Sequence, residues 1–166
     1  SGAIACTLAS EFKNAKVTAL DISEGAISIA QQNAEKIGVQ DRIDFITADA
    51  SEFDVSDDEN IFSGMDIIVS NPPYISPDDT DIDVAVKKFE PASALFAGEN
   101  GTQFIQKWAK RYTPILGKPG LMIFEIGRTQ GEIAKKIFSD LKIFDSVEIV
   151  RDLSGHHRFI KGIRHG

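Results

Sequence analysis

The sequence predicts an α/β fold in which helices cover both faces of a mostly parallel β-sheet. Short apolar runs alternate with segments whose apolar residues recur at helical spacing, and this alternation is typical of such a sheet. The chain has 166 residues, of which 42% are hydrophobic and 26% are charged. That length is enough to bury one hydrophobic core. We therefore expect residues 1–166 to form a single domain.

Six segments are predicted strands, and the first four are apolar enough to be buried on both faces of the sheet. The last two are separated by a short polar turn and are predicted to form an antiparallel hairpin that closes the sheet edge. On that hairpin we interpret Arg158 and Lys161 as edge-strand charges. The predicted strands are 16–20, 43–47, 66–70, 121–126, 146–150 and 157–162.

The clearest helix lies between the first two strands. Ser23 can cap its beginning and Gly38 can end it in the left-handed conformation, with apolar residues at a 3.6-residue period between them. Two more helices are predicted at 101–116 and 129–141. A turn at Gly117, Pro119 and Gly120 is expected to separate the first of these helices from the strand at 121–126, and residues 75–100 show no clear periodicity.

Composition excludes several classes of protein. The apolar runs are far shorter than the roughly 20 residues of a membrane helix, and the first residues lack the pattern of a signal peptide. We therefore expect a cytoplasmic protein that spans no membrane. The net charge is -7, which argues against a protein whose main task is to bind a phosphate backbone. The single cysteine, Cys6, is expected to be a buried, inert thiol.

Polar residues follow three of the predicted strands. Asp21, Asp49 and the sequence Asn71-Pro72-Pro73-Tyr74 each stand just after a strand. Ligands of open parallel sheets bind beyond the carboxyl ends of the strands. The sequence therefore places a candidate binding site at this sheet edge.

Asn71-Pro72-Pro73-Tyr74 suits chemistry on a planar amide or amine nitrogen. Such a nitrogen is a poor nucleophile because its lone pair is delocalised. The Asn71 side-chain oxygen and the Pro72 carbonyl can each accept a hydrogen bond from this nitrogen and align its lone pair with a methylsulfonium, so that no general base is needed. The prolines fix the backbone, and Tyr74 can stack on the planar substrate. The alternative is a simple turn that ends a strand.

The two aspartates suit a nucleoside. Asp21 can accept both ribose hydroxyls, as the acidic residue after the second strand does in dinucleotide-binding folds. Asp49 can accept an adenine amino group, with Ala50 beside the ring. The alternatives are that Asp21 only precedes a helix and that Asp49 only caps a turn.

With these motifs, the sequence resembles the HemK/PrmC family of S-adenosylmethionine-dependent methyltransferases, which modify the glutamine of the Gly-Gly-Gln loop in peptide-chain release factors. The resemblance runs essentially end to end, and its last three elements narrow it most. The elements are Ser1-Gly2-Ala3-Ile4-Ala5, Asp21-Ile22-Ser23, Asn33-Ala34, Arg42-Ile43, the run from Ile68 to Ile75, Phe89-Glu90-Pro91 with Ala94-Leu95, Glu125-Ile126-Gly127 with Gln130, and Asp152 to Gly155 with Arg158.

The resemblance implies a Rossmann-like class I methyltransferase fold and S-adenosylmethionine as cofactor. It also implies a release factor as partner, and nucleic acid is not expected as the direct substrate. Cofactor contacts are implied for Ser1, Gly2, Asp21, Asp49, Ala50 and Asn71. Catalytic and glutamine-binding roles are implied for Asn71, Pro72, Pro73 and Tyr74, and a substrate-side role for Glu90.

One departure from the family concerns its glycine-rich loop, Asp-Leu-Gly-Thr-Gly-Ser-Gly, of which this chain carries only the last two residues, Ser1 and Gly2. The first strand before that loop and the family's N-terminal helical domain are expected to be missing. For these 166 residues alone we expect weak or undetectable binding of S-adenosylmethionine, because most of the loop's N–H groups are absent.

Other functions remain open from the sequence. A nucleic-acid methyltransferase acting on an exocyclic amine would use the same acceptors, and the basic C-terminal hairpin is its only support. A non-catalytic remnant of the fold is a third reading. No metal site is expected, since His156 and His157 are adjacent and would point to opposite faces of a strand. Neither the preferred release factor nor the oligomeric state follows from the sequence.

Overall fold

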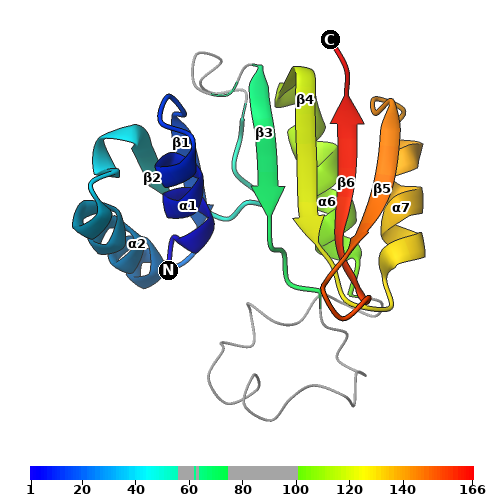
Figure 1. Ribbon diagram of the computed structural model, residues 1–166, viewed down its shortest axis with the longest axis horizontal. Helices are drawn as coiled ribbons and strands as arrows, with labels where there is room; N and C mark the ends of the chain where they lie inside the picture. The colour runs from blue at the N-terminus through cyan, green and yellow to red at the C-terminus, as the bar shows by residue number, and fades with distance from the viewer. Residues whose placement is uncertain (56–61, 63, 75–100) are drawn as a thin grey trace. The chain divides into compact units, whose positions relative to one another are not determined.

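The structure is a computed structural model that describes residues 1–55, 62, 64–74 and 101–166. Its contacts divide the chain into two compact units, Ser1–Asp54 and Val55–Gly166, which are coloured blue to cyan and cyan to red in Figure 1. Each unit is an α/β structure in its own right. Whether residues 1–166 act as one domain stays a prediction.

The N-terminal unit is a two-stranded parallel sheet packed against two helices. Its core consists of small and branched side chains, among them Ala9 and Ala34, which have no exposed surface. Cys6 is buried in the same cluster with 6% of its surface exposed, as predicted. The elements are α1 (Ala3–Glu11), β1 (Val17–Asp21), α2 (Glu24–Ile37), the 3-10 helix η1 (Gln40–Arg42) and β2 (Ile43–Thr47).

Helix α2 begins and ends where the sequence predicts. The Ser23 hydroxyl oxygen accepts a hydrogen bond from the backbone N–H of Ala26 at 3.2 Å. At the other end, Gly38 has φ 72°, and its N–H donates to the carbonyls of Ala34 and Glu35. Both ends are thus capped by local interactions, which explains why local sequence signals are enough to locate this helix.

The C-terminal unit is a four-stranded mixed sheet in the order β3-β4-β6-β5, which Figure 1 shows as adjacent arrows. Strands β3 and β4 are parallel, whereas β6 is antiparallel to both of its neighbours. The predicted combination of parallel strands with an antiparallel C-terminal hairpin is therefore confirmed. The elements are β3 (Met65–Ser70), α6 (Gln103–Tyr112), the 3-10 helix η2 (Thr113–Ile115), β4 (Leu116–Glu125), α7 (Gly131–Asp140), β5 (Ser146–Arg151) and β6 (His157–Arg164).

Helices α6 and α7 contact each other and share one core with the sheet. At its centre, the Phe124 ring of β4 meets the Phe138 ring of α7 edge to face, with centroids 5.5 Å apart. Phe138 also stacks on Phe144 at 5.4 Å. Because Phe124 and Phe138 are both fully buried, this aromatic cluster fixes α7 against the sheet.

Strand β4 is longer than predicted, because it begins at Leu116 and includes Gly117, Pro119 and Gly120, where a turn before the strand was expected. The strand begins at Leu116, which pairs with Met65, and the next paired position is Leu121 with Ile67. Residues 117–120 therefore bulge out of the ladder with β3, and a bulge tolerates a proline that has no N–H to donate.

Two further expectations about the sheet are wrong. Strand β3 is not buried on both faces, since Ile67 keeps 39% of its surface exposed. Arg158 and Lys161 are not edge-strand charges, because β6 lies between β4 and β5. Each is instead paired with a carboxylate on a neighbouring strand or turn. Within the described residues, no helix is long and apolar enough to cross a membrane.

Candidate functional site

In the N-terminal unit, the two candidate nucleoside-binding aspartates lie at the same edge of the sheet. Asp21 is the last residue of β1, where the parallel register places it opposite Thr47 of β2. The chain leaving β2 stays close, since the Ala48 N–H donates to the Asp21 carbonyl at 3.0 Å. Asp49 follows directly. The structure thus brings together the ends of both strands, as the parallel pattern predicts.

The Asp21 carboxylate is exposed and only partly engaged. Its Oδ1 accepts the Ser23 backbone N–H at 2.9 Å, which is the helix-entry contact of the alternative interpretation. That bond uses one oxygen and leaves the carboxylate with acceptor capacity. Asp21 also borders a cavity of about 50 Å³, whose other lining residues include Gly2, Ala30 and Phe45. A carboxylate and a glycine backbone therefore meet at one small cavity.

Gly2 approaches α2 more closely than any other residue type could. It has φ 69° at the N-terminus of α1, and a Cβ built on it would lie 2.6 Å from the Cβ of Ala30. Its carbonyl accepts the Cys6 N–H at 2.8 Å, and the Ser1 carbonyl accepts the Asn33 side-chain N–H at 3.0 Å. Sequence and sterics together require glycine at position 2.

Asp49 caps a turn. Its Oδ1 accepts the Ser51 N–H at 2.7 Å, and its carbonyl accepts the N–H groups of Glu52 at 2.9 Å and Phe53 at 2.8 Å. The turn interpretation of Asp49 therefore describes what its oxygens do in this structure. The expected role of Asp49 and Ala50 beside an adenine stays a prediction.

In the C-terminal unit, Asn71-Pro72-Pro73-Tyr74 directly follows β3. Pro72 is fully buried, Pro73 and Tyr74 are half-buried, and the Asn71 side chain is exposed. The motif is thus anchored by its first proline and presents its amide outward. This is the arrangement expected of a rigid segment that offers acceptors to a ligand.

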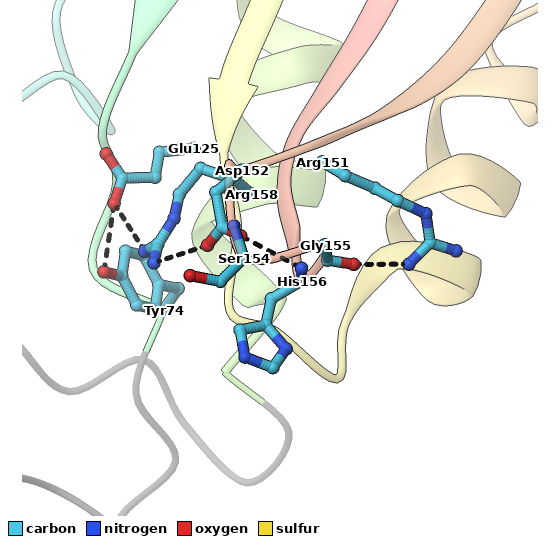
Figure 2. A network of polar contacts seen from close by, with 8 residues as sticks. All are labelled: Tyr74, Glu125, Arg151, Asp152, Ser154, Gly155, His156 and Arg158. Carbon is cyan, nitrogen blue, oxygen red and sulfur yellow. Dashed lines mark hydrogen bonds and ion pairs between the residues drawn. The ribbon is translucent and has the colours of Figure 1, made fainter.

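Tyr74 is held at both its side chain and its backbone. Figure 2 shows its hydroxyl donating to Glu125 Oε1, at 3.1 Å. The Tyr74 carbonyl accepts the Gln130 side-chain N–H at 2.6 Å. Gln130 in turn accepts the Gly127 N–H at 2.9 Å, and only 7% of its surface is exposed. The end of the motif is therefore fixed to the segment that follows β4.

Glu125 belongs to a chain of charges that continues to the hairpin turn (Figure 2). Arg158 donates from one guanidinium nitrogen to Glu125 at 3.4 Å and from the other to Asp152 at 3.3 Å. The side chains of Glu125 and Asp152 each keep 23% of their surface exposed, and that of Arg158 keeps 38%. Arg158 therefore bridges two partly buried carboxylates.

Asp152 organises the turn between β5 and β6. Its Oδ1 accepts the backbone N–H of Ser154 at 2.9 Å and of His156 at 3.0 Å. Burial raises the pKa of Asp152, but these hydrogen bonds and that from Arg158 outweigh it and hold the pKa below its ordinary value. Burial lowers the pKa of Arg158, but the Asp152 hydrogen bond and the charge of Glu125 raise it above its ordinary value.

A glycine, Gly101, lies against the hydrogen bond between Tyr74 and Gln130. Gly101 has φ 65°, and a Cβ built on it would overlap the Tyr74 carbonyl oxygen and the Gln130 side-chain nitrogen. The hydrogen bond between Tyr74 and Gln130 therefore passes directly over the Gly101 backbone. Only glycine provides both that conformation and that space.

The described residues place most of the predicted site, but in separate units. Ser1, Gly2, Asp21, Asp49 and Ala50 belong to the N-terminal unit, whereas Asn71, Pro72, Pro73 and Tyr74 belong to the C-terminal one. Glu90 lies outside the described residues. Searched over the described parts of the chain, His, Cys, Asp and Glu side chains form no group of three that could hold a metal ion.

The interactions of Glu125, Gln130, Asp152 and Arg158 with each other and with Tyr74 were not predicted. The sequence marked these residues only as parts of a family resemblance. For Glu125 and Asp152 a usable signal was their position, since Glu125 ends β4 and Asp152 directly follows β5. At such positions an opposite charge on a neighbouring strand is a natural partner.

Comparison with known proteins identifies relatives along the whole chain. The model of the family "Methyltransferase small domain" matches residues 1–119. Proteins named release factor glutamine methyltransferase are 35% identical in Bacillus cereus and 39% identical in Lactococcus lactis, in each case over 96% of this chain. The matches cover 55% and 56% of those relatives, so the chain spans about half of their length.

Solved structures of methyltransferases share the fold. An S-adenosylmethionine-dependent O-methyltransferase from Thermotoga maritima has a TM-score of 0.69 at 16% identity, covering 100% of this chain and 56% of its own. The N-methyltransferase NodS from Bradyrhizobium japonicum has a TM-score of 0.60 at 16% identity, covering 99% and 81%. Since the family model covers well over half of the sequence, the chain belongs to the methyltransferase small domain family.

Proposed function

We propose that this chain is the catalytic part of an S-adenosylmethionine-dependent methyltransferase that methylates the side-chain amide nitrogen of a glutamine. The proposed substrate is the glutamine of the Gly-Gly-Gln loop of a peptide-chain release factor, and the proposed location is the cytoplasm. The relatives named release factor glutamine methyltransferase support this substrate. This chain spans about half of the length of those relatives, so their activity is proposed for it.

The observation that carries the proposal is that the Asn71 to Tyr74 segment has a fixed backbone and an exposed amide side chain. Its backbone is fixed by the buried Pro72 and by the hydrogen bond from Gln130 to the Tyr74 carbonyl, while the Asn71 amide is exposed. Fixed acceptors beside an exposed edge suit a substrate whose nucleophilic atom carries two N–H bonds. A glutamine side-chain amide is such a substrate.

The N-terminal unit has residues that fit S-adenosylmethionine. The free acceptor capacity of Asp21 suits ribose hydroxyls, and Gly2 lines the same small cavity without a side chain that would fill it. In our proposal Asp21 holds the ribose and the backbone of Ser1 and Gly2 meets the methionine end. When bound, the cofactor supplies the electrophilic methyl group.

The chain's own residues would then prepare the nucleophile. The Asn71 side-chain oxygen and the Pro72 carbonyl accept hydrogen bonds from the two N–H groups of the substrate amide. This pairing favours a tetrahedral nitrogen with a localised lone pair, and the rigid prolines keep the acceptors in place without reorganisation. As the nitrogen bonds to the methyl group, the bond between that methyl and the cofactor's sulfur breaks, and one N–H proton of the nitrogen passes to solvent. Tyr74 provides the face on which the planar amide lies.

The nucleic-acid alternative loses part of its support, because two cations of the hairpin are paired with carboxylates. The basic C-terminal hairpin was its only favourable feature in the sequence. In the structure, Arg158 is bonded to Glu125 and Asp152, and Lys161 Nζ lies 2.6 Å from Glu148. Cations that are already paired contribute less to binding a phosphate backbone than free ones.

Intact-protein mass spectrometry of a release factor tests the proposal. The chain, restored with the complete glycine-rich loop and the strand before it, is mixed with S-adenosylmethionine and the release factor, and the mass of the target is followed. We expect a gain of one methyl group on the Gly-Gly-Gln peptide, lost in Asn71→Ala and retained in Asn14→Ala, since Asn14 lies in an exposed turn. No gain on the release factor, with label entering DNA or RNA instead, would favour the nucleic-acid alternative.

A further inference from the structure

The side chains around Tyr74 follow the order of the strands in the C-terminal sheet. Tyr74 comes after β3, Glu125 ends β4, Arg158 lies near the start of β6 and Asp152 follows β5. The sheet order is β3-β4-β6-β5, so each member of the set lies beside the next. Together they form a row of contacts along one edge of the sheet, which we call the Tyr74 row, as Figure 2 shows.

We propose that Glu125 is a positioning residue that orients the Tyr74 ring toward the substrate, with Arg158 and Asp152 holding Glu125 in place. The proposal rests on the function proposed above, because it assigns these residues to the same methyl transfer. It adds three residues to the four-residue motif: Glu125 on β4, Arg158 on β6 and Asp152 in the turn after β5.

The backbone geometry brings Glu125 to the motif. Ser70 pairs with Phe124 in the parallel register of β3 and β4, so that Asn71 and Glu125 are the next residues along the two strands. Glu125 pairs on its other side with Phe159 of β6, next to Arg158. Strand pairing therefore places the Glu125 carboxylate between the motif and the Arg158 guanidinium. This placement comes from the backbone and not from a side chain.

The contacts make Glu125 the shared acceptor. The same oxygen, Oε1, accepts the Tyr74 hydroxyl at 3.1 Å and the Arg158 guanidinium at 3.4 Å. Arg158 is restrained at its second nitrogen by Asp152, which is itself fixed by two backbone N–H groups. Each member thus limits the rotation of the next, and the last member to be limited is the ring of Tyr74.

This arrangement differs from a simple stabilising ion pair. Tyr74 already has a backbone anchor through Gln130, so the hydroxyl contact is not needed to hold the segment. Its effect is on the angle of the ring. The Tyr74 ring has to lie flat against the planar amide, and it positions the amide less well when it can rotate. Catalytic groups need to be held within narrow angles.

The test is a double-mutant cycle in the steady-state methylation of a release factor. Glu125→Gln, Glu125→Ala and Asp152→Asn are each made alone and with Tyr74→Phe. We expect Glu125→Ala to lower kcat about tenfold with a smaller change in KM. Glu125→Gln should lower kcat less, because an amide oxygen can still accept a hydrogen bond from the Tyr74 hydroxyl. In the Tyr74→Phe background these substitutions should change kcat little further.

The matched control is Glu148→Gln, which breaks the 2.6 Å ion pair with Lys161 on the same hairpin. We expect it to leave kcat unchanged. A merely structural role of Glu125 would lower stability without coupling to Tyr74. If Glu125→Ala lowers kcat equally in the presence and absence of the Tyr74 hydroxyl, the positioning role is wrong.

A second measurement separates this inference from the proposed function. The protein contains two tyrosines, Tyr74 and Tyr112, so 3-fluorotyrosine labelling gives two fluorine signals that Tyr112→Phe assigns. We expect Glu125→Gln to shift the Tyr74 signal and Glu148→Gln to leave it in place. If no release factor is methylated, the proposed function fails. An unmoved Tyr74 signal in Glu125→Gln overturns the orientation of the ring by Glu125, whatever the substrate is.

Discussion

Replacing Gly101 by alanine should destabilise the C-terminal unit through two separable effects. The residue has φ 65°, and the left-handed conformation costs a residue with a Cβ about 1–2 kcal/mol. The new Cβ would also fall 3.0 Å from the Tyr74 carbonyl carbon and still closer to the carbonyl oxygen and the Gln130 side-chain nitrogen. Displacing that hydrogen bond adds about 1 kcal/mol.

The expected loss of unfolding free energy is therefore about 2–3 kcal/mol. Gly64→Ala isolates the conformational part, because Gly64 has φ 70° but nothing within 4 Å of a built Cβ. Urea unfolding followed by the fluorescence of Trp108, the protein's single tryptophan, which lies in α6, measures the C-terminal unit directly. Equal losses for Gly101→Ala and Gly64→Ala would refute the steric argument.

Two further predictions concern the carboxylates. In a protein that carries the complete glycine-rich loop, Asp21→Ala should weaken S-adenosylmethionine binding in calorimetry by about tenfold. Asp44→Ala, on the exposed side of β2, should not, and equal effects would exclude a ribose-binding role. The pKa of Asp152 lies below its ordinary value in the folded protein, so its stabilising contribution is present above the unfolded pKa and is lost as pH falls below about 4. Thermal unfolding of Asp152→Asn should accordingly depend less on pH in that acid range than the wild type does, and identical slopes would contradict the hydrogen-bonding account.

Local features of the fold could be predicted, and features that depend on pairing could not. The limits of α2 follow from Ser23 and Gly38, which act within one turn of the helix. The start of β4 depends instead on its pairing with β3 and β6 and on the bulge at 117–120. Glycine and proline in that stretch indicate a turn, and only the strand register shows that the strand already begins before it, at Leu116.

The candidate site divides in the same way. Asp21, Asp49 and the Asn71 to Tyr74 motif could be identified because each follows its own strand in the sequence. The Tyr74 row could not, because its contacts join residues that are 51 positions apart for Tyr74 and Glu125 and 33 apart for Glu125 and Arg158. Their meeting depends on the sheet order β3-β4-β6-β5, which no single segment encodes.

The Tyr74 row has a consequence for protein engineering. Asn-Pro-Pro-Tyr reads as a compact, movable unit, yet its tyrosine is oriented from β4 and restrained through the β5–β6 turn. Grafting the four residues onto the strand end of another scaffold would transfer the prolines without these supports. A successful transplant would have to carry the acceptor carboxylate, its guanidinium and the hairpin turn as well, so the smallest transferable part is the edge of a whole sheet.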